Sequence, residues 1–154
     1  MKVAVSSDER TELVDAVLRE LELRGCSVEY FGPEPGEESG DAHDWPLVTY
    51  KAAEKVARGE ADLAVVMCWT GTGASLAANK VSGVRAALCS DAETARGARV
   101  WNHANALALS LRATTPALAQ EILKVWFDTP LSTDDWNQKQ IERIAAIEKG
   151  ESPE

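Results

Sequence analysis

Few residues of this sequence suit a disulfide framework or a metal centre. The 154 residues include two histidines and three cysteines, Cys26, Cys68 and Cys89. The number of cysteines is odd and no pair has the CxxC spacing, which excludes a disulfide-stabilised miniprotein and gives no support to a zinc site. We therefore expect a reducing compartment.

Basic residues and long apolar runs are also scarce. The chain has 16 Lys and Arg against 25 Asp and Glu, a net charge of −9. Because nucleic-acid binders normally present a basic face, we expect no nucleic-acid partner. No stretch approaches the ~20 apolar residues of a membrane helix, and the apolar run after Met1 is too short for a signal peptide. The sequence predicts a soluble, cytoplasmic protein with no membrane partner.

Short apolar runs alternate with amphipathic stretches, a pattern typical of α/β proteins. Apolar residues make up 45% of the chain, within the globular range of about 45–50%. The pattern predicts strands at 2–6, 26–31, 62–68, 84–89 and 105–109, and helices at 11–23, 46–58, about 74–80, 92–100, 116–127 and 134–148. We expect one three-layer α/β/α Rossmann-like domain over residues 1–148 with a five-stranded parallel sheet, followed by a frayed tail at 149–154.

The segments that follow the predicted strands are the places to look for a site. In open parallel sheets ligands bind outside the carboxyl ends of the strands. These ends are at 7–9, 68–73, 89–93 and 109–112, and we add the helix-to-strand loop at 101–103. The loop at 32–45 is the one long loop, and a compact domain usually keeps such a loop for function.

The densest signal is the run CWTGTG at 68–73, where a buried strand meets a glycine turn that opens a helix. Glycines let backbone N–H groups approach a ligand oxygen, and a helix start adds roughly half a positive charge. Two chemistries remain open. Gly71, Gly73 and a later Asp91 loosely imitate a dinucleotide fingerprint, although Leu76 replaces the third glycine. Alternatively Cys68 is a nucleophile or a base, unless it only packs in the core.

Several motifs together resemble one family of sugar isomerases. They are CxTGxG at 68–73, AANK at 77–80, GxRA at 83–86 and NxxN at 102–105. Ser7-Asp8 after the first strand, Asp44-Trp45-Pro46 in place of the usual Asp-Tyr-Pro, and the IExI pattern at 141–144 add to the likeness. The chain resembles the ribose-5-phosphate isomerase B and galactose-6-phosphate isomerase family over nearly its whole length.

The resemblance implies an aldose–ketose isomerase, an intramolecular oxidoreductase that acts through a cis-enediol. It implies a homodimer, or a dimer of dimers, with active sites at the subunit interface and with no metal or organic cofactor. Cys68 takes the position of the base that moves a proton between C2 and C1. The N–H groups of Gly71, Thr72 and Gly73 would hold the enediolate oxygen. Thr70 would pass protons between O1 and O2, and Asp8 would bind sugar hydroxyls and assist ring opening.

The chain departs from the family at positions that surround the sugar and its phosphate. Glu9 and Trp101 stand where the family has histidines, and Trp136 and Gln140 stand where it has two basic residues of the last helix. Arg112 remains, and the resemblance leaves Lys139 as a substitute cation. The substrate-binding set that follows from the resemblance is Glu9, Trp45, Trp69, Gly71, Thr72, Gly73, Trp101, Asn102, His103, Arg112, Trp136, Lys139 and Gln140.

Four of the five tryptophans fall on these site segments, whereas Trp126 lies on an amphipathic helix and is expected in the core. Flat aromatic faces suit the C–H-rich faces of sugars. One hypothesis is therefore an unphosphorylated or unusually substituted sugar, and the alternative is that these tryptophans only fill loops. His103 could bring an imidazole to the sugar or be structural, and His43 is a loop residue or a site residue. A second class of function, a non-catalytic sugar-binding or regulatory protein, also stays open.

Overall fold

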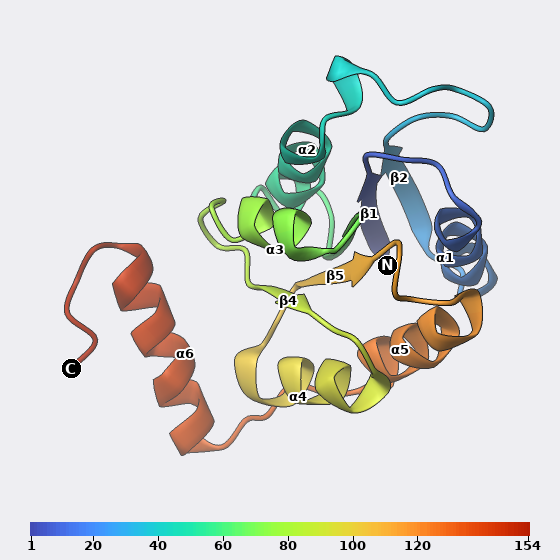
Figure 1. The fold of residues 1–154 in the computed structure, drawn as a ribbon. Coiled ribbons are helices and arrows are strands. Elements are labelled where there is room, and N and C mark those ends of the chain that lie inside the picture. The colour runs from blue at the N-terminus through green and yellow to red at the C-terminus, as the bar shows by residue number, and fades with distance from the viewer.

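The computed structural model describes residues 1–154 and contains one parallel sheet of five strands (Figure 1). The strands are β1 (Lys2–Ser7), β2 (Ser27–Phe31), β3 (Leu63–Cys68), β4 (Ala86–Leu88) and β5 (Ala106–Ser110). They are arranged in the order β2-β1-β3-β5-β4, and every neighbouring pair is parallel. The central strand β3 is buried along its whole length, as expected for a strand covered on both faces.

Helices cover both faces of the sheet, so the predicted three-layer α/β/α architecture is confirmed (Figure 1). One face packs against α1 (Glu12–Leu23), α4 (Ala92–Asn102) and α5 (Pro116–Asp128). Trp126 of α5 is fully buried in this core, as predicted. The opposite face packs against α2 (Trp45–Ala57) and α3 (Thr72–Ala78). That second core consists mostly of alanines from the sheet and the two helices: Ala4, Ala52, Ala53, Ala64, Ala74, Ala78, Ala106 and Ala108.

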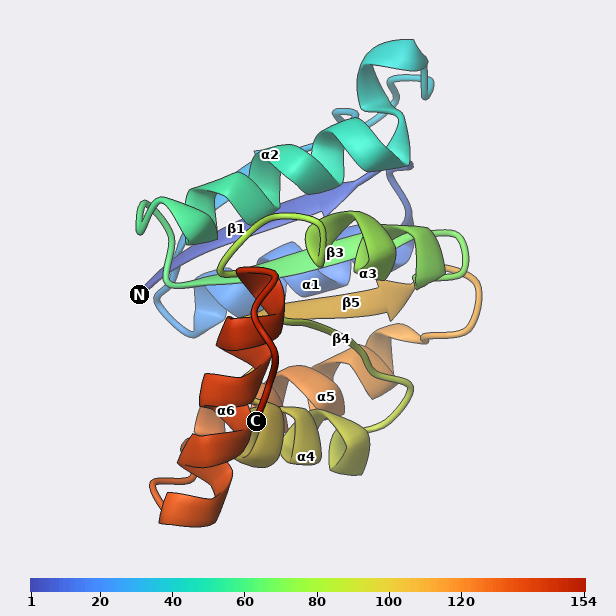
Figure 2. The ribbon, with the colours of Figure 1, turned by 90° about the vertical axis from the view of Figure 1, so that its left-hand side faces the viewer.

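The last helix, α6 (Asp135–Glu148), does not cover the sheet. It lies beside the β4 edge, near the end of α4 (Figures 1 and 2). Asn137 is its one buried residue, and Ile144 and Ile147 are about half exposed. No helix of the chain is long and apolar enough to cross a lipid bilayer.

The predicted element boundaries agree with the structure to within two residues, and the shortest element is β4. The predicted strand at 84–89 is only three residues long, because asparagine side chains replace part of the ladder. The Arg85 N–H donates to Oδ1 of Asn105 at 2.7 Å. Asn79 bonds both the N–H and the carbonyl of Ala86, at 2.8 and 2.9 Å. The AANK motif therefore covers the outer edge of the sheet.

The strand order creates a crevice between β1 and β3. After β1 the chain builds outward to β2, whereas β3, β5 and β4 lie on the other side of β1. Loops at the carboxyl ends of β1 and β3 therefore diverge, which is where open α/β sheets bind ligands. The long loop 32–45 rises over this crevice and contains the short 3-10 helix η1 (Asp41–His43).

Candidate active site

The register of the sheet brings the ends of three strands to one level. Ser7 of β1 pairs with Met67 of β3, and Cys68 pairs with Ser110 of β5. Asp8, the residue after Ser7, therefore emerges beside Cys68 on the neighbouring strand. Two of the predicted catalytic residues, distant in sequence, are placed at the same edge by parallel pairing alone.

The Cys68 side chain is 5% exposed, and its sulfur faces the start of α3. The backbone N–H of Ala74 donates to Sγ at 3.4 Å. A donor in this position stabilises negative charge on the sulfur. The sulfur therefore lies between the alanine-rich core and the glycine turn, with its polar neighbour on the side of the turn.

The glycine turn is shaped by Gly71, whose φ of +75° is in the left-handed region. A Cβ at this position would lie 2.6 Å from Leu88 Cδ1 and 2.9 Å from the Leu109 carbonyl group, so only glycine fits. The Gly71 N–H donates to the Cys68 carbonyl at 3.1 Å. It closes the turn and is not free for a ligand, which corrects the sequence-based expectation. The N–H groups of Thr72 and Gly73 have no acceptor in the protein and remain available.

A small pocket joins Thr70 to Arg112 at the ends of β3 and β5. The hydroxyls of Thr70 and Thr72 are 2.7 Å apart. The Trp69 carbonyl accepts bonds from Ser110 Oγ at 2.9 Å and from the Arg112 N–H at 3.1 Å, while the Trp69 side chain is 56% exposed. Arg112 is exposed and has no carboxylate partner. Its guanidinium is available to an anion at this side of the site.

An acidic depression lies on the other side of the turn, at the end of β1. Its lining includes Asp8, Glu9, His43, Asp44 and Trp45. The indole of Trp45 covers the turn so closely that a Cβ on Gly73 would lie 3.0 Å from its ring. Trp45 therefore joins the depression to the free N–H groups near Cys68.

The surroundings of Asp8 raise the pKa of its carboxyl group above the ordinary value. Burial raises the pKa of Asp8, the negative charges of Glu9 and Asp44 raise it further, and hydrogen bonds from the backbone of Asp8 and Glu9 partly offset this. Its Oδ1 atom is buried and has no hydrogen-bond partner. A raised pKa makes the Asp8 carboxylate a stronger proton acceptor and shifts its titration toward neutral pH, which suits acid–base chemistry.

We expect the Asp8→Asn substitution to raise stability at neutral pH. Because the pKa of Asp8 is higher in the folded chain than in the unfolded chain, its contribution is most favourable at low pH and is lost as the pH rises through the folded-state pKa. The urea midpoint of the variant should exceed that of the wild type at neutral pH, and the difference should narrow as the pH falls toward 3.8, the ordinary value. Parallel pH profiles for the two proteins would contradict the assignment.

Six of the predicted site residues lie at the opposite edge of the sheet. They are Trp101, Asn102, His103, Trp136, Lys139 and Gln140. The reason is geometric, since a helix that connects parallel strands runs back to their amino ends. The end of α4 therefore cannot meet Cys68 within one chain, and the expectation that residues 101–103 join the carboxyl edge is wrong for the single chain. Figure 2 shows α6 near the end of the sheet opposite to the β5 arrowhead.

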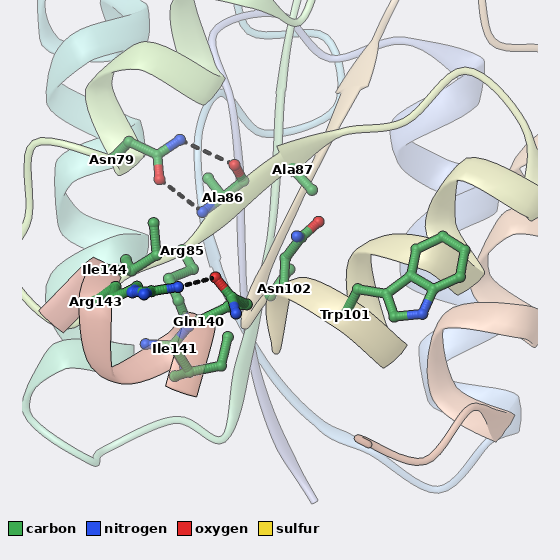
Figure 3. A pocket seen from close by; sticks show the side chains of 11 residues that line it. Asn79, Arg85, Ala86, Ala87, Trp101, Asn102, Gln140, Ile141, Arg143 and Ile144 are labelled. Atoms are coloured by element: carbon green, nitrogen blue, oxygen red, sulfur yellow. Dashed lines mark hydrogen bonds between the residues drawn. The ribbon is translucent and has the colours of Figure 1, made fainter. Parts of the chain in front are cut away.

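Three of them, Trp101, Asn102 and Gln140, line a groove between β4, α4 and α6 (Figure 3). Trp101 and Asn102 approach it from α4, and Gln140 and Arg143 approach it from α6, joined by a hydrogen bond of 3.1 Å. The Trp101 ring lies against Gly97, with the Arg96 guanidinium 5.4 Å from its centre. Trp136 is 68% exposed at the start of α6.

His103 has a structural role in the single chain. It ends α4 with a φ of +47°, and its Nε2 lies 2.9 Å from the Ser132 carbonyl oxygen and 3.1 Å from Asn137 Nδ2. These contacts fasten α6 to α4. They engage Nε2 of the imidazole, so the structural alternative for His103 fits the single chain.

The other sequence alternatives also find structural explanations. Asp91 is the N-cap of α4, where its carboxylate accepts the Thr94 N–H at 2.7 Å, so it is not free to bind a ribose. Burial raises the pKa of Cys89 to about 12, which keeps it a thiol. Cys26 packs against the larger core. Of the three cysteines, Cys68 alone lies beside a glycine turn.

Comparisons with known proteins agree with this architecture. The model of the family described as Ribose/Galactose Isomerase matches residues 3–144. The ribose-5-phosphate isomerase B of Escherichia coli is 36% identical over 114 residues, 74% of this chain and 76% of that protein. The D-erythrulose-4-phosphate isomerase of Pectobacterium atrosepticum is 30% identical over 98% of this chain and 97% of that protein.

The solved structures show the same likeness. The ribose-5-phosphate isomerase B of Clostridium thermocellum superimposes with a TM-score of 0.89 and 37% identity, covering 97% of this chain and 99% of that one. The chain therefore belongs to the ribose/galactose isomerase family of enzymes.

Proposed function

We propose that the chain interconverts an aldose phosphate and a ketose phosphate through a cis-enediol, with Cys68 as the base. The observation that carries this proposal is the position of the Cys68 sulfur beside the glycine turn, 3.4 Å from the Ala74 N–H. The thiolate takes the proton from C2 of the open-chain aldose and returns it to C1. The Thr70 hydroxyl passes a proton from O2 to O1, so that the carbonyl moves from C1 to C2 without any cofactor.

The enediolate oxygen accepts hydrogen bonds from the N–H groups of Thr72 and Gly73, which have no acceptor in the protein. Donors that are already oriented in the folded protein stabilise charge that develops only in the transition state. The substrate phosphate lies toward Arg112, whose charge is unpaired, and away from the carboxylates of the acidic depression. This orientation avoids close contact between a dianion and Glu9.

An unphosphorylated sugar is the second candidate substrate. The acidic depression favours it, because Glu9 stands beside Asp8 where a phosphate would be repelled. The exposed rings of Trp45 and Trp69 at the same edge could cover the apolar face of a sugar. If this alternative holds, kcat/KM for the free sugar is close to kcat/KM for the same sugar with a phosphate.

The complete site is proposed to need a second copy of the chain. Six residues of the predicted binding set lie at the far edge of the sheet, where only another subunit could bring them to Cys68. The α6 helix leaves Ile144 and Ile147 about half exposed, which provides apolar surface for such a contact. The proposed assembly is a homodimer, alone or paired as a dimer of dimers.

A deuterium-exchange screen tests this function. Tetroses, pentoses and hexoses, each with and without phosphate, are incubated with the enzyme in D2O, and label at C1 and C2 is measured. Hydrogen exchange that is confined to the sugar phosphates supports the first candidate. Comparable exchange with the free sugars supports the second. A protein that binds these sugars without exchanging any hydrogen would instead belong to the non-catalytic class.

A further inference from the structure

The chain has one histidine whose imidazole is free. The His103 ring is held by Ser132 and Asn137, as described above. The His43 ring makes no hydrogen bond, is partly buried, and lines the acidic depression together with Asp8. No step of the proposed isomerisation uses this imidazole.

The position of His43 over the end of β1 is fixed by two contacts. The Ser39 hydroxyl donates to the Asp8 carbonyl at 2.5 Å, which ties the long loop to the strand end. The His43 N–H donates to the Gly40 carbonyl at 2.7 Å and closes η1. His43 and Asp8 therefore line the same depression, and Trp45 connects it to the glycine turn.

An isomerase that acts on an aldose of five carbons needs a further pair of proton-transfer groups. Such a sugar is mostly cyclic, but enediol formation requires the open aldehyde. Ring opening breaks the bond between C1 and the ring oxygen. The proton of the O1 hydroxyl leaves to a base, the electron pair forms the C1 carbonyl, and the ring oxygen takes a proton from an acid. One imidazole and one carboxyl within the same depression can supply both groups.

We propose that His43 and Asp8 form the proton-transfer pair that opens the cyclic sugar before Cys68 acts. This inference rests on the proposed function and adds His43 to its machinery. Asp8 donates a proton to the ring oxygen and His43 accepts the proton of the O1 hydroxyl. The open ketose leaves without closing a ring, so Asp8 regains a proton from water and His43 releases one to water before the next turnover. In the reverse direction, closure of the aldose ring reverses both transfers.

The test compares a cyclic substrate with one that cannot close its ring. Ribose 5-phosphate forms a ring through O4. Ribulose 5-phosphate has its O5 blocked by the phosphate and stays open. For the His43→Gln variant we expect kcat/KM for ribose 5-phosphate to fall by about 10²-fold, while deuterium exchange into C1 of ribulose 5-phosphate stays within about threefold of the wild type. Added imidazole should restore part of the ribose 5-phosphate turnover. Glu38→Gln, an exposed change in the same loop, should leave both rates unchanged.

The outcomes separate this inference from the function on which it rests. Equal losses with both sugars, or no loss with either, overturn the role of His43. The melting temperature is measured for each variant, and His43→Asn replaces His43→Gln if the latter destabilises the fold. A wild-type enzyme that exchanges no hydrogen into ribulose 5-phosphate overturns the ring-opening role. One that exchanges no hydrogen into any sugar phosphate of the screen contradicts the proposed function itself.

Discussion

Replacement of Cys68 by alanine is expected to reduce solvent hydrogen exchange into the sugar by about 10²–10⁴-fold, the usual contribution of a positioned base. The loss should appear in kcat rather than in KM, because the sulfur acts on the C2 hydrogen and contributes little to ground-state binding. Deuterium label at C1 and C2, followed by NMR, measures it directly. Cys68→Ser places an oxygen near the same donor, the Ala74 N–H, and should also be strongly impaired, since a hydroxyl is a far weaker base than a thiolate.

The control for this experiment is another buried cysteine. Cys89→Ala removes a thiol that burial keeps protonated, at the end of β4. Its activity should stay near that of the wild type, with a somewhat lower melting temperature. Exchange that persists in Cys68→Ala at the wild-type rate would show that another group is the base.

Replacement of Gly71 by alanine is expected to have the second large effect. A left-handed backbone costs a non-glycine residue roughly 1–2 kcal/mol, and the new Cβ would also overlap the backbone carbonyl of Leu109. The turn must then move, and with it the N–H groups of Thr72 and Gly73. Loss of one such donor typically costs about 10²–10³-fold in kcat.

Gly59→Ala is the matched control for this prediction. Gly59 also has a left-handed backbone, with a φ of +71°, but a Cβ there meets no atom within 4 Å. In urea unfolding both variants should lose stability from backbone strain, and Gly71→Ala should lose more because its Cβ also overlaps the Leu109 carbonyl. Only Gly71→Ala should lose activity. If Gly59→Ala lost as much activity, strain alone would explain the result and the turn would have no special role.

The order of strands and helices could be predicted because apolar residues repeat with periods of two and 3.6. The carboxyl edge followed from that order, which is why Asp8 and Cys68 were correctly expected at one edge. Residues 101–103 were grouped with the segments at the carboxyl ends, although the order of strands and helices already places the end of a connecting helix at the amino ends of the strands. The short β4 depended on the side chains of Asn79 and Asn105, whose partners lie at least seven residues away in the sequence.

Parts of the candidate site lie beyond what sequence patterns can show. The sequence does not distinguish His43 from the other residues of its loop. The hydrogen bond between Ser39 and Asp8, which are 31 residues apart, places this loop over the end of β1. The Gly71 N–H bonds the Cys68 carbonyl within the turn, and the sequence motif alone does not show this hydrogen bond. A tertiary hydrogen bond decided the first and a local turn hydrogen bond decided the second, and periodicity carries no information about either.

The alanine-rich core under α2 and α3 has a consequence for the chemistry. The closeness of α3 to the sheet, and so the 3.4 Å between the Ala74 N–H and the Cys68 sulfur, depends on methyl groups being the largest side chains at most positions of that layer. A bulkier residue at Ala64 or Ala108 would push α3 away from the sheet. The chain could remain folded on its larger core, but the Cys68 sulfur would lose its contact with the Ala74 N–H. The small side chains of this layer therefore set the distance between the sulfur and its hydrogen-bond donor.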